Sequence, residues 1–503
     1  FDWSSIQTVR ALQSLKKDAI VVNCNPETVS TDYDMASRLY FEELTLERVR
    51  DIGEFEKPEG MILSTAGQIP NNLALPLAKV GVRIFGTAPE DIDRAEDRKK
   101  FSTILDKLGI SQPRWAEITS LPQARKVARE FGYPVIIRPS YVLSGTAMNV
   151  VFEEKTLTEY IRRAVALSTE HPVVISKFIE SAREIEMDGV SKGGEIVTMI
   201  MSEHVENAGT HSGDATVVIP AQKTYSETAH RVVRMTKQIA KALLITGPFN
   251  IQFVAEDNKV KVIECNLRSS RSFPFVSKAT NTNLIDVAIL SMFGKKTHVP
   301  ARPTAEMPHV AVKSPQFSYN RIREADPLGY VEMASTGEVA AFGDTYHEAL
   351  LKSAMSSWFK IPKKRVLVSI GGDRAKRKLL EKIQKLSEKG ISLVGTEGTS
   401  AFLRQNGIPC MTVHKIRTRK GPNIEDYLKK GVVDLIVNVP VNYLARDRED
   451  GYVIRRRAID EGIPLISNLQ VAEALIDALS DTSLSELHAK SSDEYFAASK
   501  KRR

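Results

Sequence analysis

The sequence Asn250-Ile-Gln-Phe-Val-Ala-Glu-Asp-Asn-Lys-Val-Lys-Val-Ile-Glu-Cys-Asn266 decides the fold of the central part of this 503-residue chain. It is typical of a β-hairpin, because two runs of alternating apolar residues flank a polar Asp-Asn turn. A symmetric register pairs Gln252 with Glu264 and Asn250 with Asn266. Side chains alternate faces with period 2, so Gln252, Glu264 and Asn266 are predicted to share one surface.

This surface is rich in the oxygen donors that hard cations prefer. Mg²⁺ binds carboxylate and carbonyl oxygens and keeps room for phosphate, so the hairpin predicts a site for a metal–nucleotide complex. The alternative is an ordinary hairpin with a solvated polar face, since polar alternation is common on half-exposed strands. The hairpin alone leaves both interpretations open.

Length and composition indicate a soluble globular protein of about three domains. Apolar residues make up 42% and charged residues 26% of the chain. Neither a run of 18 apolar residues nor a signal-peptide pattern occurs, so the sequence predicts no membrane span. The chain begins at Phe1 rather than Met, and we therefore expect a piece of a longer polypeptide or a processed product.

The three cysteines, Cys24, Cys265 and Cys410, are odd in number and far apart, which argues against a disulfide framework. We expect their side chains to be small and buried. We also expect the protein to be in a reducing compartment, the cytoplasm or alternatively the mitochondrial matrix. The formal net charge of +8 could indicate a nucleic-acid partner, but acidic residues are interspersed with the basic ones. An enzyme that handles anionic phosphates is the simpler interpretation.

Residues 1 to about 90 have the rhythm of a small parallel α/β unit, with apolar runs at 19–23, 60–64 and 82–86. Asn23-Cys-Asn-Pro-Glu-Thr28 and Gly67-Gln-Ile-Pro-Asn-Asn72 follow predicted strands, where turns build ligand crevices. Both segments also fit plain turn chemistry.

From about residue 91 to 300 the pattern becomes α+β. It predicts helices near 96–108 and 120–131, a strand that ends at Arg138 and a strand at 173–177. The small residues of Pro139-Ser-Tyr-Val-Leu-Ser-Gly-Thr146 could cover phosphates with their backbone amides. No GxxxxGK[ST] motif occurs, so the sequence does not predict a P-loop.

A third unit begins after the basic, proline-containing linker at 360–365. A helix to Lys389 and a series of predicted strands indicate a separate Rossmann-like domain. The strands are expected at 366–370, 391–395, 435–438 and 464–467. Residues from about 484 onward are polar, and we predict that they are mobile.

Phosphoryl transfer needs cations aimed at phosphate oxygens in addition to a metal site. Arg98 begins a predicted helix, and Arg138 and Lys177 end predicted strands. Arg268 and Arg271 directly follow the hairpin. Each of these alone is more typical of a surface salt bridge. Their position at strand ends beside the metal face, the predicted surface of Gln252, Glu264 and Asn266, favours a phosphate site.

The segment Glu203-His-Val-Glu-Asn-Ala-Gly-Thr-His-Ser-Gly-Asp214 is predicted to be a loop between two strands that can wrap a base, a ribose or an acyl group. His204, Glu206, His211 and Asp214 could in principle bind zinc. No cysteine pair accompanies them and their spacing fits no standard zinc pattern, so zinc catalysis is disfavoured.

Six motifs occur in order along the chain. They are Val22-Asn-Cys-Asn-Pro-Glu-Thr-Val-Ser-Thr31, Gly67-Gln-Ile-Pro-Asn-Asn-Leu-Ala74, Ile92-Asp-Arg-Ala-Glu-Asp-Arg98, Arg138-Pro-Ser-Tyr-Val-Leu-Ser-Gly145, Ser202-Glu-His-Val-Glu-Asn-Ala-Gly-Thr-His-Ser-Gly-Asp214 and Ser272-Phe-Pro-Phe-Val-Ser-Lys278. Together they resemble the large, ammonia-dependent chain of carbamoyl phosphate synthetase. The resemblance covers nearly the whole sequence and corresponds to the C-terminal half of that chain.

The resemblance implies an α/β and α+β multidomain fold. It places a pre-ATP-grasp Rossmann-like domain at 1–91, an ATP-grasp domain at 92–300, its extension and linker at 301–362, a Rossmann-like, methylglyoxal-synthase-like regulatory domain at 363–483 and a polar tail at 484–503.

The resemblance also implies site residues. The family's ATP ligands fall on Arg98, Arg138, Lys177, Ile179, Glu184, Gly209, Thr210, His211, Ser212, Gln252 and Glu264. Its Mg²⁺ or Mn²⁺ ligands fall on Gln252, Glu264 and Asn266, in agreement with the hairpin, and K⁺ is a further cofactor to test. Arg268 and Arg271 match arginines near the transferred phosphate, and Asn266 joins them as a catalytic candidate. The family often has Val where Thr210 stands, a small change at a backbone-type contact.

In this family the first half forms carbamate from bicarbonate and ammonia, and the C-terminal half phosphorylates carbamate with a second ATP. Carbamate is short-lived in water, so it must reach a dry site through the protein. The resemblance therefore implies a carbamate-kinase step, catalysed by charge neutralisation. The expected partners are the N-terminal synthetase half and a glutaminase domain or subunit, with no nucleic acid and no membrane, and a homo-oligomer stays open.

Effector-binding positions of the family fall on Ser369, Thr396, Thr399, Lys415 and Asn438. Lys415 stands where N-acetylglutamate-activated members carry Trp, and a cation there suits a phosphate-bearing, nucleotide-type effector. A regulatory fold that has lost its ligand is the alternative.

Three other functions stay open at this point. Another ATP-grasp ligase would consume ATP with a carboxylic acid and an amine, and a non-catalytic half would bind nucleotide without turnover. A nucleic-acid binder would show steeply salt-dependent retention on DNA. Neither the pathway, arginine or pyrimidine, nor the effector follows from the sequence.

Overall fold

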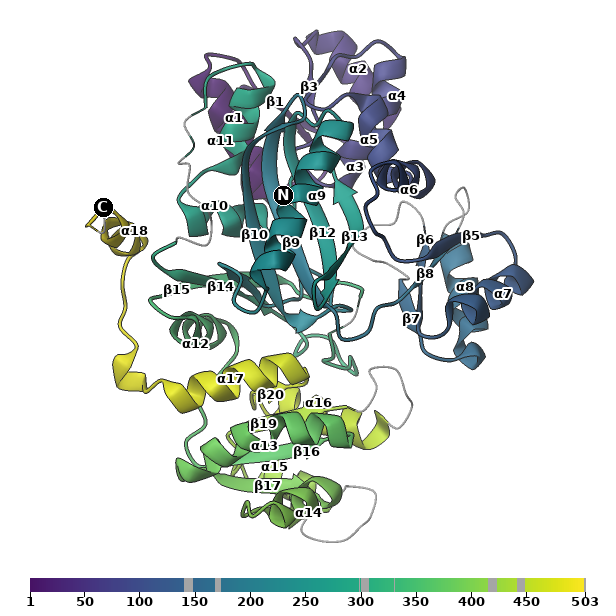
Figure 1. Ribbon diagram of the computed structural model, residues 1–503. Coiled ribbons are helices and arrows are strands. Elements are labelled where there is room, and N and C mark those ends of the chain that lie inside the picture. Colours follow the sequence, from purple (N-terminus) through teal and green to yellow (C-terminus); the bar gives the residue numbers. More distant parts are fainter. Residues whose placement is uncertain are drawn as a thin grey trace. The chain divides into compact units, whose positions relative to one another are not determined.

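The computed structural model describes residues 1–139, 148–167, 173–297, 299, 307–329, 331–414, 423–440 and 448–501 (Figure 1). Residues 1–116, 181–203 and 219–307 form one compact unit, the first unit. Residues 117–180, 204–218 and 308–503 form the second unit.

The first unit combines short parallel strand pairs with long antiparallel strands. Its elements are α1 (Asp2–Ser14), β1 (Ile20–Asn23), η1 (Val29–Thr31), β2 (Arg38–Phe41), α2 (Leu46–Glu56), β3 (Met61–Ile62), α3 (Gln68–Asn72), α4 (Ala74–Lys79), β4 (Ile84–Phe85), α5 (Pro89–Glu96), α6 (Arg98–Lys107), β9 (Arg183–Lys192), β10 (Glu195–Asn207), α9 (Ser226–Ala242), β12 (Gly247–Glu256), β13 (Lys259–Asn266), α10 (Phe273–Thr280) and α11 (Leu284–Met292).

The N-terminal part of this unit confirms the predicted small parallel α/β arrangement. Strands β1 and β2 pair in parallel, and so do β3 and β4. Helix α6 begins at Arg98, as predicted, because the Asp97 side chain accepts a hydrogen bond from the backbone N–H of Lys100 and caps the helix.

The antiparallel strands β9, β12 and β13 form the frame of the candidate site (Figure 1). On β12, Phe249, Ile251 and Phe253 are completely buried and belong to one apolar cluster with residues of α5, α6 and α9. The polar residues Asn250 and Gln252 alternate with them, so they point to the opposite face of the sheet.

The second unit contains a small mixed domain, a two-stranded segment and a parallel α/β domain. Its elements are β5 (Trp115–Ile118), α7 (Leu121–Phe131), β6 (Val135–Pro139), β7 (Asn149–Val151), α8 (Glu154–Leu167), β8 (Val173–Lys177), β11 (Val217–Ile219), β14 (Val310–Gln316), β15 (Gly337–Gly343), α12 (Tyr346–Ser357), β16 (Arg365–Ile370), α13 (Asp373–Glu388), β17 (Ser392–Thr396), α14 (Glu397–Gln405), β18 (Met411–Val413), α15 (Ile424–Lys429), β19 (Leu435–Val439), α16 (Arg448–Asp460), β20 (Leu465–Ile466), α17 (Leu469–Asp481), η4 (Leu484–Glu486) and α18 (Ser492–Lys501). Strands β5, β10 and β11 have residues in both units.

The C-terminal domain confirms the predicted Rossmann-like fold. Its five strands lie in the order β18-β17-β16-β19-β20, and each neighbouring pair is parallel. Figure 1 shows helices α13 and α17 side by side against this sheet. The carboxyl ends of parallel strands meet at one edge of such a sheet, which is where ligands of open α/β folds bind.

The polar tail is ordered through α18, so the predicted mobility from residue 484 onward was wrong. Tyr495 is only 4% exposed, and its hydroxyl donates to the carbonyl of Phe342 at 3.0 Å. The Lys352 ammonium donates to the same hydroxyl at 3.0 Å. Phe496, the next residue of this largely polar helix, packs edge-on against the Phe342 ring. Two aromatic residues thus anchor the segment, and an average over composition hides them.

Two other expectations need correction. The segment from Glu203 is not all loop, because β10 continues to Asn207. Cys24 is exposed, whereas Cys265 and Cys410 are buried as expected and all three are free thiols.

Among the helices of the described ranges, none combines the length and the apolar character that crossing a bilayer requires.

Arg455 of α16 is the largest fully buried side chain among the described residues, at 1% exposure. Its guanidinium binds both carboxylate oxygens of Asp326, at 2.7 and 2.6 Å, and donates to Oδ1 of Asn438 at 2.8 Å. These bonds join the C-terminal domain to the segment before β15.

Replacing Arg455 with methionine should destabilise the second unit by about 2 kcal/mol, because it leaves Asp326 without its partner. The loss is smaller than for a fully buried pair because the Asp326 side chain is 19% exposed and water can still reach it. Calorimetry should show a Tm that is several degrees lower. Arg457→Met on the same helix removes an exposed pair with Glu425 and should change Tm little. Equal shifts in the two variants would contradict this account.

Candidate active site

The predicted polar face of the hairpin is present. Gln252 pairs with Glu264, and Asn250 with Asn266. The Asn266 amide donates to Oε1 of Glu264 at 3.1 Å, so these two side chains point toward one another. The three predicted donors, Gln252, Glu264 and Asn266, are half-buried on one surface.

A β-bulge at Ile263 creates this face, and the sequence did not reveal it. The register slips between Gln252 and Phe253, because Phe253 pairs with Val262 and leaves Ile263 unpaired. Without the extra residue, strict alternation from Val262 would turn Glu264 toward the core. Arg98 donates from Nη1 to the Ile263 carbonyl at 2.8 Å, and thereby bonds the bulge from helix α6.

The donor set fits a hard divalent cation. One carboxylate and two amide side chains offer oxygen ligands, which suit Mg²⁺ or Mn²⁺ better than zinc. In the parts of the chain that the structure describes, no group of three or more His, Cys, Asp or Glu residues could hold a metal. His204, Glu206, His211 and Asp214 therefore form no such group within the described residues.

Arg268 is held in a fixed position directly after β13. Its Nε donates to Oε1 of Gln68 at 2.9 Å, its Nη1 to the Ser269 carbonyl at 3.1 Å and its Nη2 to Oδ1 of Asn266 at 3.4 Å. Gln68 belongs to the Gly67–Asn72 motif, which was predicted as a turn but forms helix α3, and this segment takes part in the candidate site through Gln68. Arg271 lies nearby, and both guanidinium groups lie within 6 Å of the Phe1 ring.

Glu96 is a further carboxyl of this site that the sequence did not single out. Burial raises its pKa, and the positive charge of Arg268 opposes part of that rise. The Asn71 amide donates to Oε1 of Glu96 at 3.1 Å. The guanidinium of Arg268 is itself buried, which lowers its pKa, while Glu96 and Glu264 raise it. Arginine keeps its charge under such conditions, so Arg268 brings a buried positive charge to the metal face.

Beside the metal face, on the neighbouring strand β9, lies a second acidic group, the acidic pair, made of Glu186 and Asp188, which pair with Gln252 and Asn250. Their side chains are 2% and 0% exposed. Burial is the largest cause that raises the pKa of Asp188 to about 7, and the neighbouring charge of Glu186 adds to it.

The free energy of unfolding should depend on pH through the titration of Asp188. Its folded-state pKa of about 7 lies above its ordinary value of 3.8, so folding takes up a proton between these pH values. The stabilising contribution of the proton is complete below pH 4 and is lost as pH rises toward 7, by on the order of 1 kcal/mol per pH unit. In calorimetry, the difference between the Tm of Asp188→Asn and the Tm of the unmodified chain should therefore shift in favour of the variant as pH rises from 5 to 7. Parallel pH profiles of the two proteins would contradict it.

The remaining predicted nucleotide residues belong to the second unit, apart from Glu184, which lies on β9 and is 9% exposed. Lys177 ends β8, and its ammonium donates to the carbonyls of Gly132 and Tyr133, at 2.9 and 3.1 Å. Arg138 lies on β6, and Ile179 follows β8. Residues 140–147, most of the predicted phosphate-covering segment, lie outside the described residues.

The loop after β10 is fixed by its own hydrogen bonds. The Asp214 carboxylate accepts from the backbone N–H groups of Ala334 and Ser335, both at 2.9 Å. The Lys313 ammonium donates to the Ser212 carbonyl at 3.1 Å. Gly209 has a φ of 116°, and a Cβ at this position would lie 3.0 Å from the Phe178 ring. These contacts fix the conformation of the loop that contains Gly209, Thr210, His211 and Ser212.

Four of the five predicted effector residues come together at the carboxyl edge of the parallel sheet. Ser369 on β16 pairs with Asn438 on β19, and the Thr396 hydroxyl lies 3.4 Å from that of Ser369. The Thr399 hydroxyl accepts from the backbone N–H of Ile370 at 3.0 Å. Lys415 lies outside the described residues.

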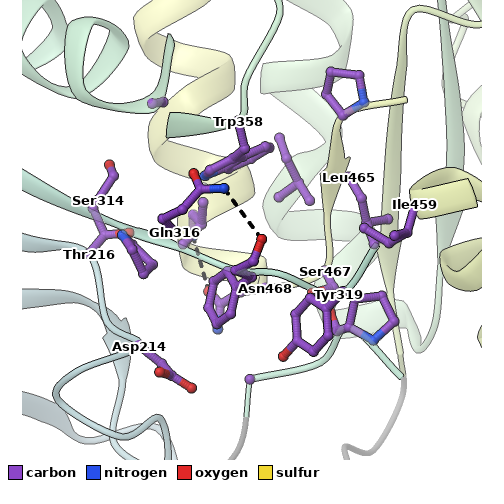
Figure 2. Close-up of a pocket in the computed structure, with 18 of the residues that line it drawn as sticks. Asp214, Thr216, Ser314, Gln316, Tyr319, Trp358, Ile459, Leu465, Ser467 and Asn468 are labelled. Atoms are coloured by element: carbon purple, nitrogen blue, oxygen red, sulfur yellow. Dashed lines mark hydrogen bonds between the residues drawn. The ribbon is translucent and has the colours of Figure 1, made fainter. Parts of the chain in front are cut away.

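A cavity of about 690 Å³ in the second unit was not anticipated. Asp214 and Gln316 line it together with Tyr319, Trp358 and Asn468 (Figure 2). Its size and its mixture of apolar and polar groups suit a small metabolite. The lining residues come from segments far apart in the sequence, so no local pattern could have revealed it.

Comparison with protein families gives three matches in order along the chain. Residues 1–94 match the carbamoyl phosphate synthase preATP-grasp domain, residues 97–297 match the ATP binding domain of the carbamoyl-phosphate synthase L chain, and residues 378–467 match the MGS-like domain.

Curated relatives are similar over almost the whole chain. The multifunctional protein pyrABCN of Emericella nidulans is 48% identical over 492 residues, which cover 95% of this chain and 22% of the relative. The mitochondrial carbamoyl-phosphate synthase [ammonia] of Rattus norvegicus is 48% identical over 489 residues, which cover 95% of this chain and 32% of the relative. The chain thus spans only a minor part of the relatives that it matches.

Solved structures show the same fold at low identity. The biotin carboxylase domain of the Hydrogenobacter thermophilus 2-oxoglutarate carboxylase, in complex with MgADP and bicarbonate, has a TM-score of 0.55 at 15% identity and covers 69% of this chain and 86% of that one. The ADP complex of the N5-carboxyaminoimidazole ribonucleotide synthetase purK has a TM-score of 0.56 at 13% identity and covers 70% of this chain and 93% of that one.

The predicted fold class is therefore confirmed, with pre-ATP-grasp, ATP-grasp and methylglyoxal-synthase-like domains in that order. The three matched domains and the identity to these synthases show that the chain belongs to the carbamoyl-phosphate synthase large-chain family, whose members are ATP-grasp ligases.

Proposed function

We propose that this chain phosphorylates carbamate with ATP to form carbamoyl phosphate and ADP. The observation that carries the proposal is the metal face of Gln252, Glu264 and Asn266, with the buried Arg268 bonded to Asn266. A phosphoryl group in transfer spreads negative charge over its oxygens, and catalysis is mainly positioning and neutralisation of that charge. The site brings those two requirements together.

In this proposal Gln252, Glu264 and Asn266 hold Mg²⁺ or Mn²⁺, which when bound neutralises phosphate oxygens. Arg268 and Arg271 neutralise the phosphoryl group that moves, and no covalent enzyme intermediate is needed. The other nucleotide ligands are Arg98, Arg138, Lys177, Ile179, Glu184, Gly209, Thr210, His211 and Ser212. K⁺ is proposed as an additional cofactor.

Partners and regulation are proposed on the same basis. Carbamate reacts with water, so a partner half that makes it from bicarbonate and ammonia, and a glutaminase that supplies the ammonia, should act with this chain. The edge formed by Ser369, Thr396, Thr399 and Asn438, with Lys415, is proposed to bind a nucleotide-type effector. The cytoplasm is the proposed compartment, with the mitochondrial matrix as the alternative because of the named rat relative.

The test is the reverse reaction, in which carbamoyl phosphate and MgADP give ATP and carbamate. It needs no partner half, and a hexokinase-coupled assay reports ATP directly. We expect ATP to form only when carbamoyl phosphate, ADP and a divalent ion are all present.

Each rival function has its own outcome in this assay. ATP consumption with a carboxylic acid and an amine, but no ATP from carbamoyl phosphate, would assign the chain to another ATP-grasp reaction. Saturable MgADP binding without any turnover would indicate a non-catalytic half.

A further inference from the structure

The acidic pair lies directly beneath the arginine segment, which we define as residues 268–272. The Ser270 hydroxyl donates to Oδ1 of Asp188 at 2.6 Å, and the Ser272 hydroxyl donates to Oδ2 of Asp188 at 2.7 Å. The Ser272 hydroxyl also lies 3.2 Å from Oε2 of Glu186. Both serines that flank Arg271 are therefore bonded to one buried carboxyl group.

The same carboxyl group is bonded to the strand that carries the metal ligands. Asn250 donates from Nδ2 to Oδ1 of Asp188 at 2.9 Å and lies 3.3 Å from Oε2 of Glu186. Asn250 precedes Gln252 by two residues on β12 and pairs with Asn266 on β13. Asp188 thus connects the metal strands to the segment that leaves them.

The other side of the arginine segment is also fixed. The backbone N–H of Ser269 donates to the Ser64 carbonyl at 2.7 Å, and Gln68 accepts from Arg268 at 2.9 Å. Asp188 supplies the bonds on the side that faces the sheet. Removing them would weaken the attachment of the segment to the sheet, where the bonds of Arg268 to Asn266 and of Ser272 to Glu186 remain.

Stability alone gives little reason for this arrangement. The hydrogen-bond donors to Asp188 include the neutral side chains of Asn250, Ser270 and Ser272, and two neighbouring carboxyl groups are costly to bury. Apolar residues of similar volume usually fill such a position at a lower free-energy cost. A buried polar network that is kept despite this cost is expected where geometry matters for function.

We propose that Asp188, supported by Glu186, is a positioning residue, which fixes the arginine segment so that Arg268 and Arg271 face the phosphoryl group beside the metal ligands. This inference rests on the proposed phosphoryl transfer. It adds Asp188 as a residue that lies outside the reacting groups but affects the rate of the transfer. Asp188 is completely buried and acts through its bonds to Ser270 and Ser272.

The test uses Asp188→Asn in the full chain, assayed by ATP formation from carbamoyl phosphate and MgADP. The change keeps the volume but turns an amide N–H₂ toward one serine hydroxyl. We expect kcat to fall about 30-fold or more, because misplacement of about 1 Å costs this much. The KM for MgADP should change less than about threefold, because Asp188 is completely buried and acts on the arginine segment.

A second variant, Ser270→Ala with Ser272→Ala, removes the same bonds without a change at the buried acid. Its kcat should fall similarly, and the triple variant should be no slower than either, since residues that act as one unit are not additive. Ser191→Ala, which removes a partly buried hydrogen bond to the Glu195 carbonyl elsewhere on β9, is the matched control and should keep the unmodified kcat.

The outcomes separate this inference from the proposed function. If the unmodified chain forms ATP and Asp188→Asn keeps its kcat, or if the effects simply add, the positioning role is wrong. If the unmodified chain forms no ATP, the proposed function fails, and hydrogen exchange then decides the positioning role. Amides of residues 267–272 should exchange at least about tenfold faster in Asp188→Asn. Unchanged exchange would overturn the inference.

Discussion

Replacing Glu264 with glutamine should abolish ATP formation from carbamoyl phosphate and MgADP, with a loss in kcat of about 10⁴-fold. The change removes the one carboxylate of the metal face. All three side chains of this face are then amides. Neutral ligands hold a divalent ion weakly, and charge neutralisation is what the ion supplies. Glutamine has nearly the volume of glutamate, and it can still bond to Asn266. Coupled measurement of initial rates at saturating MgADP checks this prediction.

The matched control lies on the same hairpin. Glu256→Gln makes the identical chemical change at an exposed residue of β12, and kcat should stay within about twofold of the unmodified value. Tm should be nearly the same in both variants, which separates loss of the metal site from loss of the fold. Activity of Glu264→Gln near that of the unmodified chain would show that the carboxylate does not serve the reaction.

Replacing Arg268 with alanine should lower kcat about 10³-fold, the lower end of the range known for arginines that stabilise a phosphoryl group in transfer. The guanidinium is buried beside Glu96 and Glu264, where its charge is screened little by water. Asn266 and Gln68 would also lose a hydrogen-bond donor. A smaller change in KM for MgADP is expected, because the charge is needed most in the transition state.

Arg268→Lys separates the charge from its geometry. Lysine keeps the positive charge but cannot reproduce three bonds from one planar group, so its kcat should lie between those of alanine and arginine. Arg231→Ala, at a half-exposed arginine paired with Glu227, is the control and should change kcat little. A kcat of Arg268→Ala within a few-fold of that control would remove Arg268 from the mechanism.

The sequence predicted the pairing of the hairpin but not the reason for it. A two-residue turn at Asp257 and Asn258 gives the pair Glu256 and Lys259, from which Gln252 would face Ile263. The bulge at Ile263 moves Glu264 into that place. Bulges depend on contacts made elsewhere, here the bond from Arg98, so alternation within one strand cannot predict them.

Local patterns were sufficient for the C-terminal domain and insufficient for the tail. Four of its strands were predicted from short apolar runs, since buried parallel strands are rich in apolar residues. Strand β18 at Met411–Val413 was missed because it is short and partly exposed. The contact of Tyr495 with Phe342 joins residues 153 positions apart, which no local pattern reports.

The candidate site was predictable only where its residues are close in sequence. Gln252, Glu264, Asn266, Arg268 and Arg271 lie within 20 residues, so strand geometry placed them together. Glu96, Gln68 and Asp188 approach the same site from distant segments. Their role follows from hydrogen bonds that only a folded chain forms.

The central claim is that Gln252, Glu264 and Asn266 hold a divalent ion in contact with the phosphates of a nucleotide. Pulsed electron–nuclear double resonance on the chain with Mn²⁺ and ADP tests it most directly, because a phosphorus coupling reports Mn²⁺ in contact with phosphate. The account predicts a phosphorus coupling from protein-bound Mn²⁺ in the unmodified chain and in Glu256→Gln, and its loss in Glu264→Gln. An equal coupling in all three proteins would show that the ion is held elsewhere and would contradict the account.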